Sequence, residues 1–165
     1  MTMIMNETQV SVWDRQPWPS PEFTPRPPSR SWSLNVLLVD DDVADTCLIL
    51  NVLKRHPQVS AAHATDAPEF ALRQLEFGRL RPDLVLLDIH MPKVDGFTFL
   101  SQMREIDSVA TVPVVFLTTS CLSSDVLRAR GASASSYVIK PEGYFELQSR
   151  LNAVVRQAAT GRWSR

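Results

Sequence analysis

The chain has 165 residues, of which 44% are hydrophobic and 21% charged, and its formal net charge is −1 at pH 7. These values indicate one globular, soluble domain with a segment to spare. They give no electrostatic reason to expect nucleic acid or an anionic membrane as a partner. No apolar run approaches the roughly 20 residues that span a bilayer, and no secretion signal is present. Cys47 and Cys121 have no metal-binding or C-x-x-C spacing, so we expect a reducing, cytoplasmic location.

The first 33 residues differ in composition from the rest of the chain. They contain six of the twelve prolines, concentrated in "PWPSPEFTPRPP". Such a stretch favours extended conformations and cannot sustain a helix or the interior of a sheet. We therefore predict a disordered proline-rich arm over residues 1–33, one folded domain over residues 34–158 and a short tail over residues 159–165.

From residue 34 onward, short apolar runs alternate with amphipathic stretches. In chain order they predict strand 34–39, helix 43–56, strand 59–64, helix 68–77, strand 83–87, helix 96–106, strand 112–118, a helix that begins near Ser123, Ser124 and Asp125, strand 136–140 and helix 144–159. Asp42 is the best N-cap candidate for the first helix, and Asp66 with Glu69 resembles a capping box at the second. Five strands alternating with five helices imply a doubly wound parallel α/β sheet.

Polar residues stand at the carboxyl ends of four predicted strands, where such sheets place their chemistry. In chain order they are Asp40, Asp41 and Asp42, then Asp88, then Thr118, Thr119 and Ser120, and finally Lys140. Clustered carboxylates repel one another unless a cation neutralises them, and oxygen ligands without His or Cys suit Mg²⁺. Mg²⁺ and an ammonium on either side of a carboxylate can stabilise a phosphoryl group that arrives there. We call the carboxyl ends of these strands the rim of the sheet. The polar residues at the rim predict an aspartate that carries phosphate.

Four motifs in this order resemble a known family. "VLLVDDD", "LVLLDIHMPKVDGF", "VVFLTTS" and "SYVIKP" are similar to the receiver domain of two-component response regulators, and "DDDVADTCLI" resembles the single-domain group with chemotaxis-type and cyanobacterial-phytochrome-type regulators. The resemblance covers about residues 34–158. It implies a flavodoxin-like fold, with a five-stranded parallel sheet of order 2-1-3-4-5 and five helices.

The resemblance also implies a role for each residue at the rim. Asp88 would be the phosphoacceptor, with Lys140 and Thr118 as its catalytic partners. Thr118 and Tyr137 would form a switch pair, in which Tyr137 turns inward when Thr118 moves towards the phosphate. In this family the peptide bond between that lysine and the following proline, here Pro141, is commonly cis.

The same resemblance implies a Mg²⁺ site. Asp41 and Asp88 would bind the ion directly, the backbone carbonyl of His90 would complete the protein ligands, and Asp40 would act through a water molecule. "GA" at residues 131–132 lies two residues earlier than in the family pattern. The fourth predicted helix (helix 4), which begins near Ser123, is therefore expected to end irregularly.

Each candidate also has an ordinary structural interpretation. Asp40 or Asp41 alone could cap the first helix, and Thr118 could be a simple β-branched strand residue. Tyr137 could be a partly buried aromatic, and Lys140 a solvated lysine. A haloacid-dehalogenase-like phosphatase would also use an aspartate after an apolar strand, but it needs a second aspartate where this chain has His90.

The predicted function is that of a phosphoryl-accepting response regulator. Its partner would be a histidine kinase, of the phytochrome type or another, or a phosphotransfer protein. It would not be an enzyme, apart from Mg²⁺-assisted self-phosphorylation and self-dephosphorylation. After about residue 158 only "ATGRWSR" follows, which leaves no room for a DNA-reading domain. The alternative is a phosphate-independent interaction module on the same fold.

Without an output domain, the protein would act through its own surface. Phosphorylation would switch the face of helix 4, strand 5 and helix 5, through which a homodimer or a kinase complex would form. On the last helix we expect Phe145, Leu151, Val154 and Val155 in the core. Tyr144 and Trp163 have no evident core role and are the predicted docking aromatics.

Overall fold

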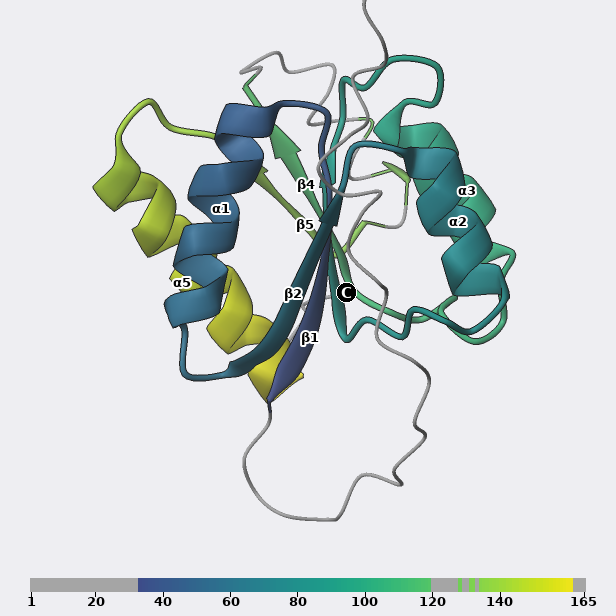
Figure 1. Cartoon of the computed structure of the whole chain (residues 1–165), viewed down its shortest axis with the longest axis horizontal. Helices are drawn as coiled ribbons and strands as arrows, with labels where there is room; N and C mark the ends of the chain where they lie inside the picture. The colour runs from purple at the N-terminus through teal and green to yellow at the C-terminus, as the bar shows by residue number, and fades with distance from the viewer. Residues whose placement is uncertain (1–32, 120–127, 129–130, 133, 162–165) are drawn as a thin grey trace, which may run out of the picture.

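The computed structural model describes residues 33–119, 128, 131–132 and 134–161. Its elements are β1 (Leu34–Val39), α1 (Val43–Arg55), β2 (Val59–Thr65), α2 (Pro68–Glu76), β3 (Leu84–Asp88), α3 (Gly96–Arg104), β4 (Val114–Thr118), β5 (Ser136–Ile139) and α5 (Tyr144–Thr160) (Figure 1). The described part contains four helices of the five predicted. Most of the helix predicted from Ser123 lies outside the described residues, although Arg128 and Gly131 are described and are helical. Cys121, Trp163 and all but the last residue of the proline-rich arm also lie outside the described residues.

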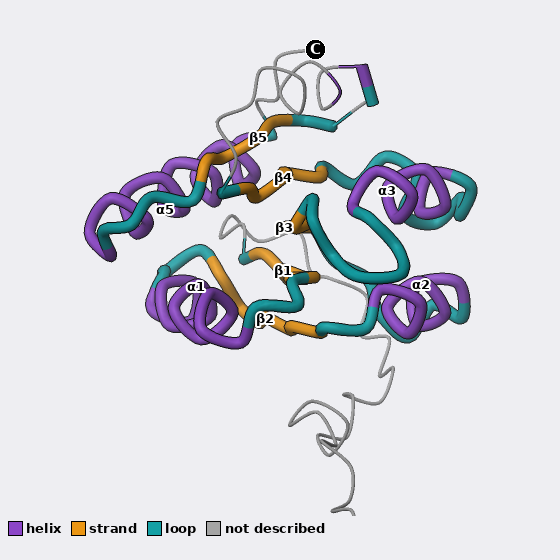
Figure 2. The backbone as a smooth tube through the Cα atoms, turned by 90° about the horizontal axis from the view of Figure 1, so that it is seen from above, coloured by secondary structure: helices purple, strands orange, loops and turns teal. Residues whose placement is uncertain are grey.

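The five strands form one parallel sheet with the order β2-β1-β3-β4-β5, as predicted. Helices α1 and α5 cover one face of this sheet, and α2 and α3 cover the other (Figures 1 and 2). Each crossover returns the chain to the same end of the sheet, so the carboxyl ends of all five strands share one edge. None of the helices in the described ranges is long and apolar enough to cross a bilayer.

The inner strands are buried on both faces because they are apolar at consecutive positions. In β1, Leu38 packs in the cluster beneath α1 and α5, whereas its neighbour Leu37 packs in the cluster beneath α2 and α3. Leu86 and Leu87 of β3 divide in the same way. One hydrophobic core therefore lies on each face of the sheet. Each fully buried leucine contributes roughly 2 kcal/mol to the free energy of unfolding.

Capping agrees with the prediction at α1 but not at α2. The side chain of Asp42 caps α1 by accepting a hydrogen bond from the Asp45 amide, at 2.9 Å. At α2 the N-cap is Ala67, which has no side-chain cap. Its amide donates to Thr65 Oγ1 at 3.1 Å, and Pro68 in the first turn has no amide that needs a cap. The predicted capping box is therefore wrong.

On α5 the sequence predicts Phe145 in the core and Tyr144 outside it, and the structure shows the reverse. Phe145 is 84% exposed, whereas Tyr144 packs against the core beneath α1 and α5. The buried stripe of α5 includes Leu147 and Leu151, and Tyr144 lies one helical turn before Leu147 on that stripe. Leu151, Val154 and Val155 are buried as predicted.

The peptide bond between Lys140 and Pro141 is trans, since no cis peptide bond occurs among the described residues. The predicted cis bond is wrong. The trans form of a bond before proline is favoured by about 0.5–1 kcal/mol unless tertiary packing selects the other.

Candidate functional site

The register of the sheet brings the predicted rim residues to one level. Val39 of β1 pairs with Leu87 of β3, so the residues that follow them, Asp40 and Asp88, lie on adjacent strands. On the other side of β3, Asp88 pairs with Leu117 of β4. Thr118 follows Leu117 and lies opposite Ile139 of β5. Lys140, the residue after Ile139, donates its backbone amide to the Thr118 carbonyl at 2.7 Å.

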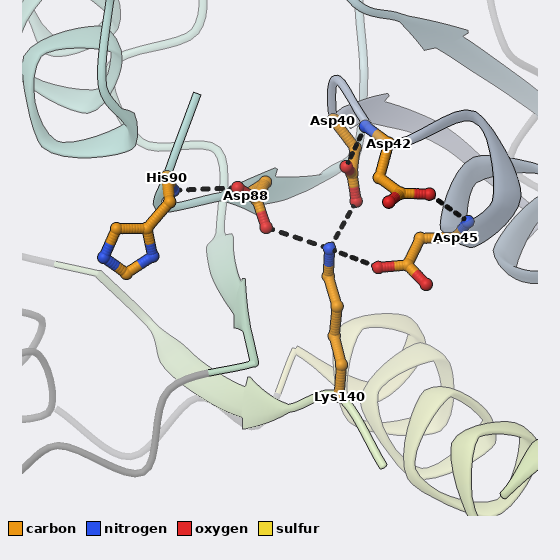
Figure 3. A network of polar contacts seen from close by, with 6 residues as sticks. All are labelled: Asp40, Asp42, Asp45, Asp88, His90 and Lys140. Atoms are coloured by element: carbon orange, nitrogen blue, oxygen red, sulfur yellow. Dashed lines mark hydrogen bonds and ion pairs between the residues drawn. The ribbon is translucent and has the colours of Figure 1, made fainter. Parts of the chain in front are cut away.

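Backbone amides fix one oxygen of each buried carboxylate. Asp40 is 2% exposed, and its Oδ1 accepts a hydrogen bond from the Asp42 amide at 2.9 Å. Asp88 is 7% exposed, and its Oδ2 accepts one from the His90 amide at 2.8 Å. The second oxygen of each carboxylate then faces the centre of the rim (Figure 3).

Lys140 fills that centre with its ammonium group. The Nζ atom lies 2.7 Å from Asp40 Oδ2, 2.9 Å from Asp88 Oδ1 and 2.9 Å from Asp45 Oδ2 (Figure 3). The ammonium donates hydrogen bonds to Asp40 and Asp45 and forms an ion pair with Asp88. The backbone directly before Lys140 is fixed by α5, because the Arg150 side chain donates a hydrogen bond to the Ile139 carbonyl at 2.6 Å.

The burial of this cluster shifts two pKa values. Burial raises the pKa of the Asp40 carboxyl to about 6, although its hydrogen bond to Lys140 limits the rise. Burial alone would lower the pKa of the Lys140 ammonium, but hydrogen bonds to Asp40 and Asp45 and the charges of Asp40 and Asp88 raise it above its usual value. Lys140 therefore stays cationic, whereas the Asp40 carboxyl, with its pKa of about 6, takes up a proton in mildly acidic solution.

Three carboxylates are arranged to hold a cation. Asp40, Asp41 and Asp88 each offer an oxygen within 4.8 Å of the others, and Asp41 is exposed. The set contains only oxygen ligands, and an exposed member leaves room for bound water. Both properties fit Mg²⁺, which retains several waters and accepts a few carboxylates.

The loop after β3 is built around a close approach of Gly96 to the backbone of Asp88. A Cβ atom on Gly96 would lie 2.4 Å from the Asp88 carbonyl oxygen. The Gly96 amide donates to the Ile89 carbonyl at 3.0 Å, and Asp95 caps α3 by accepting from the Thr98 amide at 2.7 Å. The sequence "VDG" thus holds the start of α3 against the acceptor strand.

The structure gathers Asp40, Asp41, Asp88 and Lys140 as predicted. The remaining candidates lie at the edge of this group. Thr118 is 1% exposed at the end of β4, Tyr137 is half-buried and packs with the core beneath α2 and α3, and the imidazole of His90 points away from the carboxylates (Figure 3).

Asp45 belongs to the site but was missed in the sequence. Its contact with Lys140 joins residues that are 95 apart in the chain. A usable signal was present, because Asp45 lies in the first turn of a helix that starts at the rim. An acidic residue in the first turn of a helix is also favoured by the helix dipole, so its position alone does not indicate a partner such as Lys140.

A model of the response regulator receiver domain matches residues 36–152 of the chain. The chain belongs to the response regulator receiver domain family. Phosphorylation by a kinase is the general function of such receiver domains, and histidine kinases or phosphotransfer proteins are their general partners. The predicted family membership is confirmed.

Relatives with few residues outside the receiver domain are among the matches. Response regulator Rcp1 of Synechocystis is 32% identical over 117 residues, which are 68% of this chain and 80% of that protein. The probable methanogenesis regulatory protein FilR2 of Methanothrix harundinacea is 34% identical over 123 residues, 72% of this chain and 79% of that one. The chain spans about half the length of several transcriptional regulators that it also matches.

Solved receiver structures share the fold. The phosphorylated cyanobacterial phytochrome response regulator RcpA superposes with a TM-score of 0.71 at 25% identity, covering 79% of this chain and 96% of that one. The Mn²⁺-bound form of Rcp1 gives a TM-score of 0.64 at 28% identity, covering 73% and 91%. That structure shows a divalent cation bound to a related receiver domain.

The raised pKa of Asp40 predicts a pH dependence of stability. Without metal, folded Asp40 keeps its proton up to about pH 6, whereas its ordinary pKa is 3.8. The folded state then binds more protons between these values, so the Asp40 contribution to the free energy of unfolding decreases as pH rises. Urea unfolding in chelator should therefore show Asp40→Asn gaining about 2 kcal/mol on the parent from pH 4 to pH 7. Parallel pH profiles would contradict the shift.

Proposed function

We propose that this receiver domain accepts a phosphoryl group on Asp88 from a histidine kinase or a phosphotransfer protein. Mg²⁺ would be bound directly by Asp41, Asp88 and the backbone carbonyl of His90, and by Asp40 through a water molecule. The observation that carries the proposal is the position of Asp88. Its carboxylate lies between an oxygen-only cation cluster and the Lys140 ammonium, 2.9 Å from Oδ1. Two cationic positions beside one carboxylate fit the charge of an incoming phosphoryl group.

The chain's own residues divide the work of the transfer. An Asp88 carboxylate oxygen forms a bond to phosphorus while the bond from phosphorus to the donor nitrogen breaks, and the donor histidine keeps that electron pair. Mg²⁺, when bound, neutralises charge on the transferring oxygens. Lys140 donates a hydrogen bond to a phosphoryl oxygen in place of its ion pair with Asp88, and Thr118, at the end of the neighbouring strand, donates another. The same groups assist later attack by water, so the domain removes its own phosphate.

The test is labelling of Asp88. With Mg²⁺ and a small acyl phosphate donor, intact-mass measurement should show one added phosphoryl group on the parent and none on Asp88→Asn. Asp42→Asn is the matched control, because it removes an exposed carboxylate from the same edge and keeps a good helix cap. Equal labelling of Asp88→Asn and the parent would refute the assignment.

A second prediction concerns the cation. Asp41→Ala removes one of the three clustered carboxylates, so Mg²⁺ binding and labelling should be lost together. Isothermal titration with Mg²⁺ and the labelling assay measure the two losses. Since Asp41 is exposed, the fold should stay intact by circular dichroism. Full labelling without measurable cation binding would separate the metal from the chemistry and contradict the proposal.

We also propose that phosphorylation is read on the face formed by β5 and α5. Phe145 is 84% exposed there, which fits a docking aromatic. Arg150 of α5 bonds the carbonyl directly before Lys140, so movement of Lys140 reaches α5 through a hydrogen bond. Thr118 and Tyr137 are the proposed switch pair. The partner would be a second copy of the chain or the kinase, in a phytochrome pathway or another.

The reading face is tested by sedimentation. Addition of Mg²⁺ and beryllium fluoride, a phosphoryl mimic, should tighten self-association by about fivefold or more, the lower end of usual allosteric coupling. Phe145→Ala should remove this gain. Phe77, an exposed residue directly after α2, provides the matched control Phe77→Ala. A monomer with and without the mimic would exclude the dimer, and unchanged affinity for the cognate kinase would exclude the switch altogether.

A further inference from the structure

The three carboxylates around Lys140 differ in one respect. Asp40 and Asp88 also belong to the cation cluster, whereas Asp45 does not. Asp45 contacts the ammonium at 2.9 Å from the first turn of α1. Its side chain is 30% exposed, compared with 1% for Asp40 and 9% for Asp88. Asp45 is thus the one partner of Lys140 in this network that a cation at the rim would not share.

A divalent cation changes the environment of Lys140. When the ion binds Asp88 directly and Asp40 through water, the negative charges that hold the ammonium are shared with the ion. The ammonium then lies beside a dication, and like charges repel at such distances. The Lys140 side chain is only 7% exposed, so little water is present to screen it. Without another anion, cation binding would tend to expel the ammonium from the rim.

We propose that Asp45 is a positioning residue that retains the Lys140 ammonium at the rim when a divalent cation is bound. This inference rests on the proposed function, in which cation and ammonium act on one phosphoryl group together. The backbone of Asp45 is fixed at the start of α1, because its amide donates a hydrogen bond to Oδ1 of the N-cap residue Asp42 at 2.9 Å. The N-terminal end of a helix also favours its negative charge. The ammonium therefore keeps one full anionic partner while the other two are shared.

The first test measures cation affinity without any phosphoryl donor. Mn²⁺ binding, followed by electron paramagnetic resonance of the free ion, should weaken at least about fivefold in Asp45→Asn. Asp42→Asn, which removes an exposed charge one turn away but no contact with Lys140, should weaken it by no more than about twofold to threefold. In a Lys140→Met background the two substitutions should have equal effects, because no ammonium is left to retain.

Two outcomes of this cycle would overturn the inference. One is equal weakening by Asp45→Asn and Asp42→Asn in the presence of Lys140. The other is an excess effect of Asp45→Asn that persists in Lys140→Met, since Asp45 would then act on the ion or on helix α1 directly. A parent that binds no Mn²⁺ would overturn it as well.

A second readout follows the ammonium itself and needs no Lys140 variant. A lysine ammonium held by hydrogen bonds exchanges its protons slowly enough to give a proton–nitrogen correlation signal. With saturating Mg²⁺, the Lys140 signal should persist in the parent and in Asp42→Asn and disappear in Asp45→Asn. A signal that persists in Asp45→Asn would overturn the inference. Because neither readout involves phosphoryl transfer, a failure of Asp88 labelling would refute the proposed function without deciding this test.

Discussion

Gly96→Ala is expected to destabilise the protein by about 3 kcal/mol or more, at the upper end of the cost of overpacking a core. The new Cβ atom would lie 2.4 Å from the Asp88 carbonyl oxygen and 3.1 Å from both the Ile89 Cα and the Phe116 ring. The carbonyl cannot give way cheaply, because Asp88 ends a fully buried strand. The neighbouring Ile89 amide is also bonded to the Leu117 carbonyl at 3.2 Å.

Urea unfolding in chelator measures this effect, and Gly143→Ala is its control. Gly143 has no atom within 4 Å of an added Cβ and a negative φ of −94°. Its substitution should cost no more than about 1 kcal/mol, because alanine replaces glycine only as the N-cap of α5. Gly96→Ala should also label poorly with an acyl phosphate, since the clash displaces the backbone that carries the acceptor. Equal stabilities of the two variants would show that the loop after β3 relaxes freely.

Lys140→Met is expected to cost about 3 kcal/mol in the metal-free protein at pH 8. It removes the common cation of Asp40, Asp88 and Asp45, and two of these carboxylates are buried without another ion-pair partner in the described network. The loss should shrink below about pH 6, where Asp40 takes up a proton. Mg²⁺ should restore much of the lost stability, because it binds the folded state and supplies the missing charge.

The control is Lys54→Met, the same substitution at an exposed position in the last turn of α1. Thermal and urea unfolding of both variants, with and without Mg²⁺, measure the difference. If Lys140→Met matched Lys54→Met in chelator, the ammonium would not hold the rim together. A loss that does not depend on pH would instead point to side-chain packing.

The fold and the centre of the site were predictable because both rest on short-range patterns. The run "LNVLLV" gave the bounds of β1 to the residue, and strand ends in a parallel sheet must share an edge. The sequence alone therefore predicts that Asp40, Asp88 and Lys140 lie close together. The predicted strand 112–118 begins two residues before β4 does, since Pro113 lacks the amide that would extend the ladder.

The errors lie where tertiary contacts decide the outcome. Nothing local tells Tyr144 from Phe145 at the start of α5, although the stripe that continues through Leu147 and Leu151 could have done so. Asp45 meets Lys140 because α1 and α5 pack together on one face of the sheet (Figure 2), and no local pattern in the sequence predicts that contact. The trans bond before Pro141 depends on loop packing that no local pattern encodes.

Asp88 and Lys140 are carried by strands that differ in exposure, since Asp88 ends β3 and Lys140 directly follows β5. β3 lies between β1 and β4 and all its residues are buried, so its amide protons should exchange with solvent only through global unfolding. Among the described strands β5 pairs with β4 alone, and three of its four residues are only half-buried. Local fraying of β5 is therefore cheaper than opening β3. The ammonium of Lys140 can thus leave and return on the timescale of edge fraying while Asp88 remains anchored in the slowest-exchanging part of the sheet.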